Sequence, residues 1–199
     1  MDRIWQRHEL ARKLQAKLVR YADDFVVLCR KDVATPLRVI RSILEKLELD
    51  LNEGKTKIVD ANKEEFYFLG FALKINISVK GKRYPHVNPK EKAVEKVNTR
   101  IREITARNQT WRPIQEVVRD MNQVLRGWSG YFHYRNSTAA LSKVKRHAEE
   151  RLRTHLRKRH KVSNWKTSMI RFPRRVLYEE YGLYKVPIVA GWKTAHALM

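Results

Sequence analysis

The spacing of apolar residues along the chain changes after Asn88 and Pro89. Before this point apolar residues gather in short runs separated by polar turns, as they do in strands. After it they recur every three or four residues, which is the spacing of one face of an α-helix. Three such stripes follow: Val94, Val97, Ile101 and Ile104; Ile114, Val117, Met121, Val124 and Trp128; Leu141, Val144, Ala148 and Leu152. A bundle of three helices is therefore predicted, the third starting near Ser137.

The part before Asn88 combines helix and strand signals. A helix is predicted over residues 2–15, and another begins at Thr35 and Pro36, which suit its first turn. The buried face of this second helix would consist of Leu37, Ile40, Leu44 and Leu47. Residues 66–77 are rich in aromatic and β-branched side chains and predict a strand. Helices and strands together indicate the α+β class.

Gly81 lies between the strand predicted over residues 66–77 and a second one over residues 84–87, which indicates a hairpin. A short extended segment is also expected at residues 55–59. At the other end, the stretch from Ser163 to Met199 contains several prolines and aromatic residues without a clear period. It is expected to pack in extended or short helical pieces.

The stretch KLVRYADDFVVLC, Lys17 to Cys29, predicts two strands joined by a tight turn at Ala-Asp-Asp. Aspartate is common in turns, and this alone accounts for most Asp-Asp pairs. A narrow turn between two strands, however, would hold Asp23 and Asp24 rigidly. Their oxygens could then be presented to a hard cation such as magnesium, which binds carboxylate and phosphate oxygens.

The chain has 43 Lys and Arg against 21 Asp and Glu, a net charge of +22, which favours a polyanionic partner. The excess is +6 over residues 1–88 and +16 over residues 89–199. A hydrophobic content of 43% argues against disorder. No apolar run approaches the roughly 20 residues of a membrane span, and no signal-peptide core is present. We expect a cytoplasmic protein without a membrane partner, and its single cysteine excludes an internal disulfide.

The third predicted helix carries nine Lys and Arg against two Glu between Lys143 and Lys161. Because apolar residues occupy one face, the basic side chains are expected to crowd the remaining, exposed surface. A basic surface beside exposed aromatic residues suits an RNA backbone with bases that can stack. Any single basic residue could be an ordinary solvated charge. The candidate RNA contacts are Arg126, Tyr131, Lys143, Arg146, Arg151, Arg157, Lys158 and Arg159.

Four segments resemble, in order, motifs of group II intron-encoded reverse transcriptases, which also act as maturases. They are LVRYADDFVVLC, with the Tyr-Ala-Asp-Asp (YADD) motif; LELDLNEGKTKIV; FYFLGFALKI; and LRGWSGYFHYRNS, similar to the maturase-specific thumb or domain X. The resemblance runs from Asp2 to about Lys161, and YGLYKVP and GWKTAHAL look like the ends of bacterial members. It implies a partial palm over residues 1–87, a helical thumb over residues 88–161 and a basic aromatic tail over residues 162–199.

The resemblance also implies roles for individual residues. Asp23 would bind magnesium, with Asp24 as its neighbour near the primer end. Lys55 matches a lysine that approaches the nucleotide triphosphate, although it could equally be a solvated lysine after a turn. The residues implied at the nucleotide and primer are Tyr21, Ala22, Leu69, Gly70 and Phe71, of which Phe71 is equally suited to the core.

A palm of this family needs a third carboxylate and fingers, which the sequence does not supply. The resemblance therefore implies weak magnesium binding and no polymerase activity from this chain alone. We expect it to bind intron-like RNA, or an RNA/DNA hybrid, and to contribute its aspartates to RNA-directed DNA synthesis beside an N-terminal fingers-palm polypeptide. The alternative is a catalytically inactive RNA-binding splicing factor or a mobile-element remnant. The resemblance implies a bacterial, cytoplasmic protein.

Overall fold

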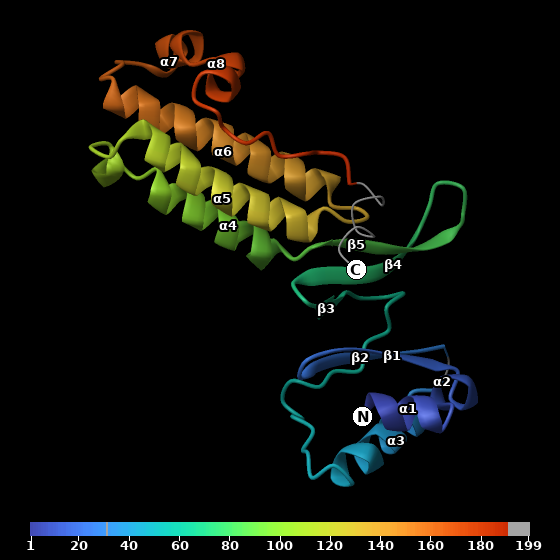
Figure 1. Cartoon of the computed structure of the whole chain (residues 1–199). Coiled ribbons are helices and arrows are strands. Elements are labelled where there is room, and N and C mark those ends of the chain that lie inside the picture. The colour runs from blue at the N-terminus through green and yellow to red at the C-terminus, as the bar shows by residue number, and fades with distance from the viewer. Residues whose placement is uncertain (31, 191–199) are drawn as a thin grey trace. The chain divides into compact units, whose positions relative to one another are not determined.

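The computed structural model describes residues 1–30 and 32–190 of the chain (Figure 1). Its contacts divide the chain into two compact units, Met1–Phe68 and Leu69–Met199, each with a hydrophobic core of its own. Both helices and antiparallel strands are present, which confirms the α+β class. The predicted division into functional parts, residues 1–87, 88–161 and 162–199, stays a prediction. None of the described helices is long and apolar enough to cross a membrane.

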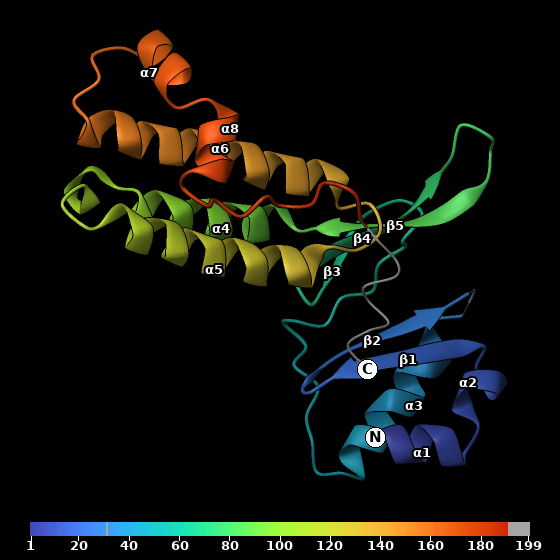
Figure 2. The same ribbon diagram turned by 45° about the horizontal axis from the view of Figure 1, so that its top comes forward.

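The first unit packs a strand hairpin against short helices (Figure 2). Its elements are α1 (Asp2–Arg7), α2 (Leu10–Lys13), β1 (Ala16–Tyr21), β2 (Asp24–Cys29), α3 (Ala34–Glu45) and β3 (Phe66–Phe68). The core combines Trp5 of α1, Ala16 of β1 and Ile40 of α3. The single helix expected over residues 2–15 is wrong, since Glu9 adopts a left-handed backbone with φ of 49° between α1 and α2.

The start of α3 is held by Asp32, which the sequence analysis did not identify. Its Oδ1 accepts the backbone N–H groups of Ala34 at 2.9 Å and Thr35 at 3.4 Å. The side chain of Thr35, followed by these backbone hydrogen bonds, lowers the pKa of the Asp32 carboxyl. The predicted buried stripe is confirmed at Ile40 and Leu44 but is wrong at Leu47, which lies beyond the helix and is 37% exposed.

The second unit begins with a hairpin of β4 (Phe71–Ile77) and β5 (Arg83–Pro89), paired from Phe71 opposite Pro89 to Ile77 opposite Arg83. Gly81, with φ of 72°, lies in the connecting turn as predicted. The strand expected over residues 66–77 is interrupted at Leu69 and Gly70, which both have positive φ. A Cβ on Gly70 would lie 3.2 Å from the Phe132 ring. Both the positive φ and this close contact therefore favour glycine at the position.

Three long helices lie side by side in the second unit (Figures 1 and 2): α4 (Glu91–Ile104), α5 (Ile114–Phe132) and α6 (Thr138–Arg159). The short helix η1 (Arg107–Gln109) lies in the α4–α5 connection. The predicted stripes are confirmed, although Ile114, Val124 and Trp128 are only partly buried. Helix α5 extends beyond its predicted stripe, through the first six residues of GWSGYFHY to Phe132.

The residues that follow α6 complete the same core. They form α7 (Trp165–Arg171), α8 (Arg174–Glu179) and an extended segment, as predicted for the described part of the tail. Phe172, Leu177, Leu183 and Val186 from this segment are buried in one cluster with the three long helices. The GWKTAHAL stretch lies outside the described residues.

Candidate nucleic-acid interface

The two units differ greatly in charge. The first, residues 1–68, has 14 Lys and Arg against 12 Asp and Glu, a net charge of +2. The second, residues 69–199, has 29 against 9, a net charge of +20. A partner that is attracted by positive charge is therefore expected on the second unit.

Three predicted RNA contacts on α6 have exposed side chains: Lys143, Arg146 and Lys158. A fourth, Arg126 on α5, is exposed as well, and its guanidinium lies 4.4 Å from the centre of the Tyr184 ring. These side chains can meet phosphate groups without rearrangement of the core.

Other basic residues of α6 form hydrogen bonds within the second unit. Arg151 donates from Nε to Thr105 Oγ1 at 3.1 Å and from Nη2 to the Thr105 carbonyl at 3.3 Å. Arg159 donates from Nη1 to the carbonyls of Thr110 and Arg112 at 2.8 and 2.5 Å. These bonds satisfy backbone carbonyls at the end of α4 and in the loop after it.

The expectation that all basic side chains of α6 lie on the exposed surface is wrong at Arg153. This residue is 3% exposed, and its Nε donates to the Phe172 carbonyl at 2.9 Å. Arg157, another predicted RNA contact, is half-buried and donates to the Ser163 carbonyl at 3.4 Å. Sequence spacing cannot separate these structural arginines from exposed ones, because their partners come from other segments.

Histidines of α6 also face the domain interior. His155 is fully buried, and its Nδ1 lies 3.4 Å from the Thr105 carbonyl, while Nε2 is buried without a hydrogen-bond partner among the residues that the structure describes. Burial lowers the pKa of His155, and the nearby charges of Arg159, Arg151 and Lys158 lower it further. Burial likewise lowers the pKa of His147.

Glu149 is a buried carboxylate that joins α6 to α8. Its Oε1 accepts the Tyr178 hydroxyl at 2.5 Å, and its Oε2 accepts Arg174 Nε at 2.8 Å. Burial, followed by the contact with Glu149, raises the pKa of Tyr178 well above its usual range. The carboxylate is thus fully engaged within the fold.

The predicted primer-contacting residues and the thumb aromatics meet inside the second unit. The Tyr131 hydroxyl donates to the Leu69 carbonyl at 3.0 Å. The Phe71 ring packs against Phe132 and Tyr131, with centroid distances of 5.0 and 5.8 Å. Phe71 is therefore part of an aromatic cluster that fastens the base of the β4–β5 hairpin to α5, while Tyr131 itself stays 55% exposed.

In the first unit, the YADD residues form the predicted hairpin, with Tyr21 paired to Asp24 and Ala22 at φ of 49° in the turn. Arg20 donates from Nη1 to the Ala22 carbonyl at 2.8 Å and from Nε to Asp2 Oδ2 at 2.7 Å. The hydrogen bond from Arg20 lowers the pKa of Asp2. The sequence analysis missed this brace, since Asp2 and Arg20 are far apart in sequence.

Asp23 and Asp24 are exposed, and their carboxylate oxygens are the donor type that magnesium prefers. Across residues 1–30 and 32–190, no group of three or more His, Cys, Asp and Glu side chains is placed to hold a metal ion. The turn thus offers magnesium the right type of donor atom, but from only two carboxylates. Lys55 lies in an exposed turn, where its backbone N–H donates to the Asn52 carbonyl at 3.1 Å.

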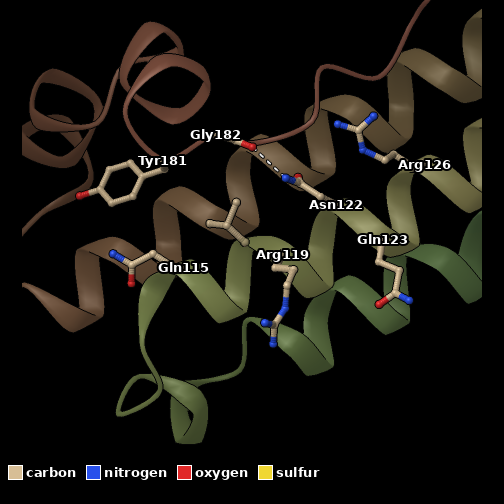
Figure 3. A pocket seen from close by; sticks show the side chains of 8 residues that line it. Gln115, Arg119, Asn122, Gln123, Arg126, Tyr181 and Gly182 are labelled. Carbon is tan, nitrogen blue, oxygen red and sulfur yellow. Dashed lines mark hydrogen bonds between the residues drawn. The ribbon is translucent and has the colours of Figure 1, made fainter.

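A hollow of about 620 Å³ lies between α5 and the segment after α8 (Figure 3). We name it the α5 hollow; it is lined by Gln115, Val118, Arg119, Asn122, Gln123, Arg126, Tyr181 and Gly182. Asn122 binds the segment through both amide atoms: Nδ2 donates to the Gly182 carbonyl at 2.8 Å, and Oδ1 accepts the Tyr184 N–H at 2.6 Å.

Of the residues that line the α5 hollow, only Arg126 was among the predicted RNA contacts. A signal was present, because Gln115, Arg119, Gln123 and Arg126 recur at helical spacing beside the apolar stripe of α5. The sequence did not show that residues near 182 lie opposite these side chains of α5.

Comparison with known proteins supports the family resemblance. Residues 94–172, from α4 to just past α7, match the family model described as "Group II intron, maturase-specific domain". A comparison with curated proteins found no match.

Proposed function

From the premise that residues 94–172 of this chain are a group II intron maturase-specific domain, we propose that the chain binds structured, intron-like RNA. The second unit carries this binding. Folded RNA is recognised largely by its shape and its phosphates, since its deep, narrow major groove is closed to side chains. A rigid, basic helical surface is suited to that kind of recognition.

The observation that carries the proposal is the concentration of charge. The second unit has a net charge of +20 and the first +2. Lys143, Arg146 and Lys158 expose their charged groups on a helix whose inner face is fixed by Leu141, Val144, Ala148, Leu152 and Leu156. Each phosphate that such groups neutralise releases counterions, so affinity depends steeply on salt.

The experiment is a titration of a structured RNA with the full chain at several salt concentrations. We expect tight binding at about 50 mM salt and a loss of at least about a hundredfold by about 200 mM. No binding at low salt, or an affinity independent of salt, would contradict the proposal.

A matched pair of variants locates the binding. Lys143→Ala/Arg146→Ala/Lys158→Ala should weaken RNA binding and flatten its salt dependence. Lys13→Ala/Lys46→Ala/Lys57→Ala removes the same charge from exposed positions of the first unit and should leave both nearly unchanged. Equal effects of the two triple variants would argue against a binding surface on the second unit.

The YADD hairpin supports a second candidate function, RNA-directed DNA synthesis. We propose that Asp23 and Asp24 would hold magnesium weakly and need further ligands from a fingers-palm polypeptide. Magnesium in such a site stabilises charge on transferring phosphoryl groups. The supporting observation is the hairpin that carries both carboxylates, with Arg20 bonded to the backbone of its turn.

Primer extension tests this second function. The chain alone should be inactive, and mixing it with a fingers-palm polypeptide should give magnesium-dependent extension that Asp23→Ala abolishes. Extension that survives Asp23→Ala would contradict the assigned role. Salt-sensitive RNA binding without extension in any mixture would favour the RNA-binding splicing factor instead.

A further inference from the structure

The α5 hollow has the features of a nucleotide site, and we propose that it takes an unpaired nucleotide of the bound RNA. This inference rests on the proposed RNA binding and adds to it a local preference for single-stranded positions. A volume of about 620 Å³ lies within the roughly 300 to 1,000 Å³ of small-molecule sites.

The apolar part of the hollow suits a base. Most of the surface that lines the hollow is apolar, and the lining includes Val118, which is 4% exposed. Tyr181 borders the hollow from the opposite side, and its half-buried ring packs edge-on against Phe172 (Figure 3). Unpaired bases bind proteins mainly by stacking on such rings and apolar surfaces.

The rim of the hollow suits the sugar-phosphate backbone. Arg119 and Arg126 are seven residues apart on α5, about 10 Å along the helix axis, so the two cations can contact separate phosphates. The amides of Gln115 and Gln123 supply donors and acceptors for base edges. No carboxylate lines the hollow among the described residues.

The acidic group beside Arg119 is already engaged. Asp120 accepts Arg112 Nη2 at 2.8 Å, and Arg119 Nε lies farther away, at 3.8 Å from Asp120 Oδ1. The Arg119 side chain is 74% exposed, so its positive charge remains accessible to a phosphate.

The side of the hollow opposite α5 is held in place by contacts within the protein. The side-chain amide of Asn122 hydrogen-bonds through both of its polar atoms to the backbone of Gly182 and Tyr184, and Arg126 packs over the Tyr184 ring. These contacts hold the extended segment beside α5, so that the hollow exists before RNA binds. A hollow of this size, open to solvent on its outer side, has room for a single nucleotide but not for a duplex.

The test compares two RNAs of the same stem, one fully paired and one with a bulge of about three unpaired nucleotides. The full chain should bind the bulged RNA about tenfold more tightly, the effect expected for stacking of one base. Arg119→Ala/Gln123→Ala should remove this difference. Both side chains are exposed, so the variant should fold normally, which its circular dichroism and melting temperature would verify.

The matched control is Lys143→Ala/Arg146→Ala on α6, which should weaken binding of both RNAs by the same factor. Salt-sensitive binding of both RNAs without a preference for the bulge would overturn the nucleotide site and leave the proposed function standing. Equal weakening of both RNAs by Arg119→Ala/Gln123→Ala would overturn it too. Absence of binding to either RNA would overturn the proposed function and with it the site.

Discussion

At the scale of single residues, α6 divides its polar side chains between two tasks. Lys143, Arg146 and Lys158 reach the surface, whereas Arg153 and Glu149 are buried and bonded to neighbouring segments. Burying a charge without a partner is costly, so the internal bonds of such residues are expected to matter for stability. This division separates variants that should unfold the domain from those that should affect RNA binding.

Tyr178→Phe should destabilise the protein. The hydroxyl donates to the buried Glu149 carboxylate at 2.5 Å, and its loss should lower the free energy of unfolding by about 1 to 3 kcal/mol. Urea unfolding measures this change. Tyr131→Phe is the matched control, because it removes a hydroxyl bonded to the Leu69 carbonyl at an exposed side chain and should cost less than about 1 kcal/mol. Equal costs would contradict the importance of the buried carboxylate.

Acid should destabilise the domain through His155. Its folded-state pKa is lowered, so between that value and the unfolded pKa of about 6.5 the unfolded chain binds more protons. The stability that His155 contributes is therefore fully present above the unfolded pKa and is lost as the pH falls toward the folded pKa. Urea midpoints at about pH 7.5 and about pH 5.5 should show a larger drop for the wild type than for His155→Asn. Identical drops would show that His155 does not contribute.

Sequence alone located the residues that repeat with a local period and missed those whose partners are distant. The apolar stripes containing Ile101, Val117 and Leu152 are found by their spacing, since helical packing depends on it. The internal roles of Arg151 and Arg159 depend on Thr105 and Thr110, some 40 to 50 residues earlier. A basic residue that caps a carbonyl and one that meets solvent have the same local signature.

At the scale of elements, the β4–β5 hairpin is anchored at one end and exposed at the other. Near its base, Val87 and Asn136 exchange hydrogen bonds, and Lys90 N–H donates to the Gly70 carbonyl at 2.8 Å. The turn is fixed by Ser78, whose Oγ accepts the Lys82 N–H at 3.1 Å. From Leu69 to Lys90 the sequence contains no Asp or Glu.

Lys80→Ala/Lys82→Ala/Arg83→Ala should weaken RNA binding and leave stability unchanged. The three side chains are exposed around the hairpin turn, and the loss should reduce the salt slope by about 0.7 to 0.9 for each phosphate contact removed. Salt titrations measure the slope, with Lys13→Ala/Lys46→Ala/Lys57→Ala as the control of equal charge. An unchanged slope in the hairpin variant would exclude the hairpin from the RNA-binding surface.

The segment after α8 should be held against α5 by Asn122. Asn122→Ala removes two hydrogen bonds, worth about 0.5 to 1.5 kcal/mol each, and should accelerate amide exchange at Tyr184 by about tenfold or more. Hydrogen-exchange mass spectrometry of residues 181–186 measures the change. Gln123→Ala, at the neighbouring exposed position, should leave exchange unaltered. Equal exchange in both variants would contradict a role for Asn122 as a clamp.

At the scale of the whole molecule, the charge follows the compact units. The predicted boundary near Asn88 gave an excess of +6 and +16, whereas division after Phe68 gives +2 and +20. The sequence placed the boundary where the apolar period changes. The structure groups the β4–β5 hairpin with the helices, because Phe71 and Leu69 contact Tyr131 and Phe132, a pairing that no local pattern reveals.

The central claim is that the second unit of this chain holds RNA. Ultraviolet cross-linking of the full chain to a structured RNA, followed by mass spectrometry of the linked peptides, tests it most directly. The account predicts that cross-links fall mainly in residues 69–190, with Tyr131, at 55% exposure, among the linked positions. Cross-links confined to residues 1–68 would contradict it.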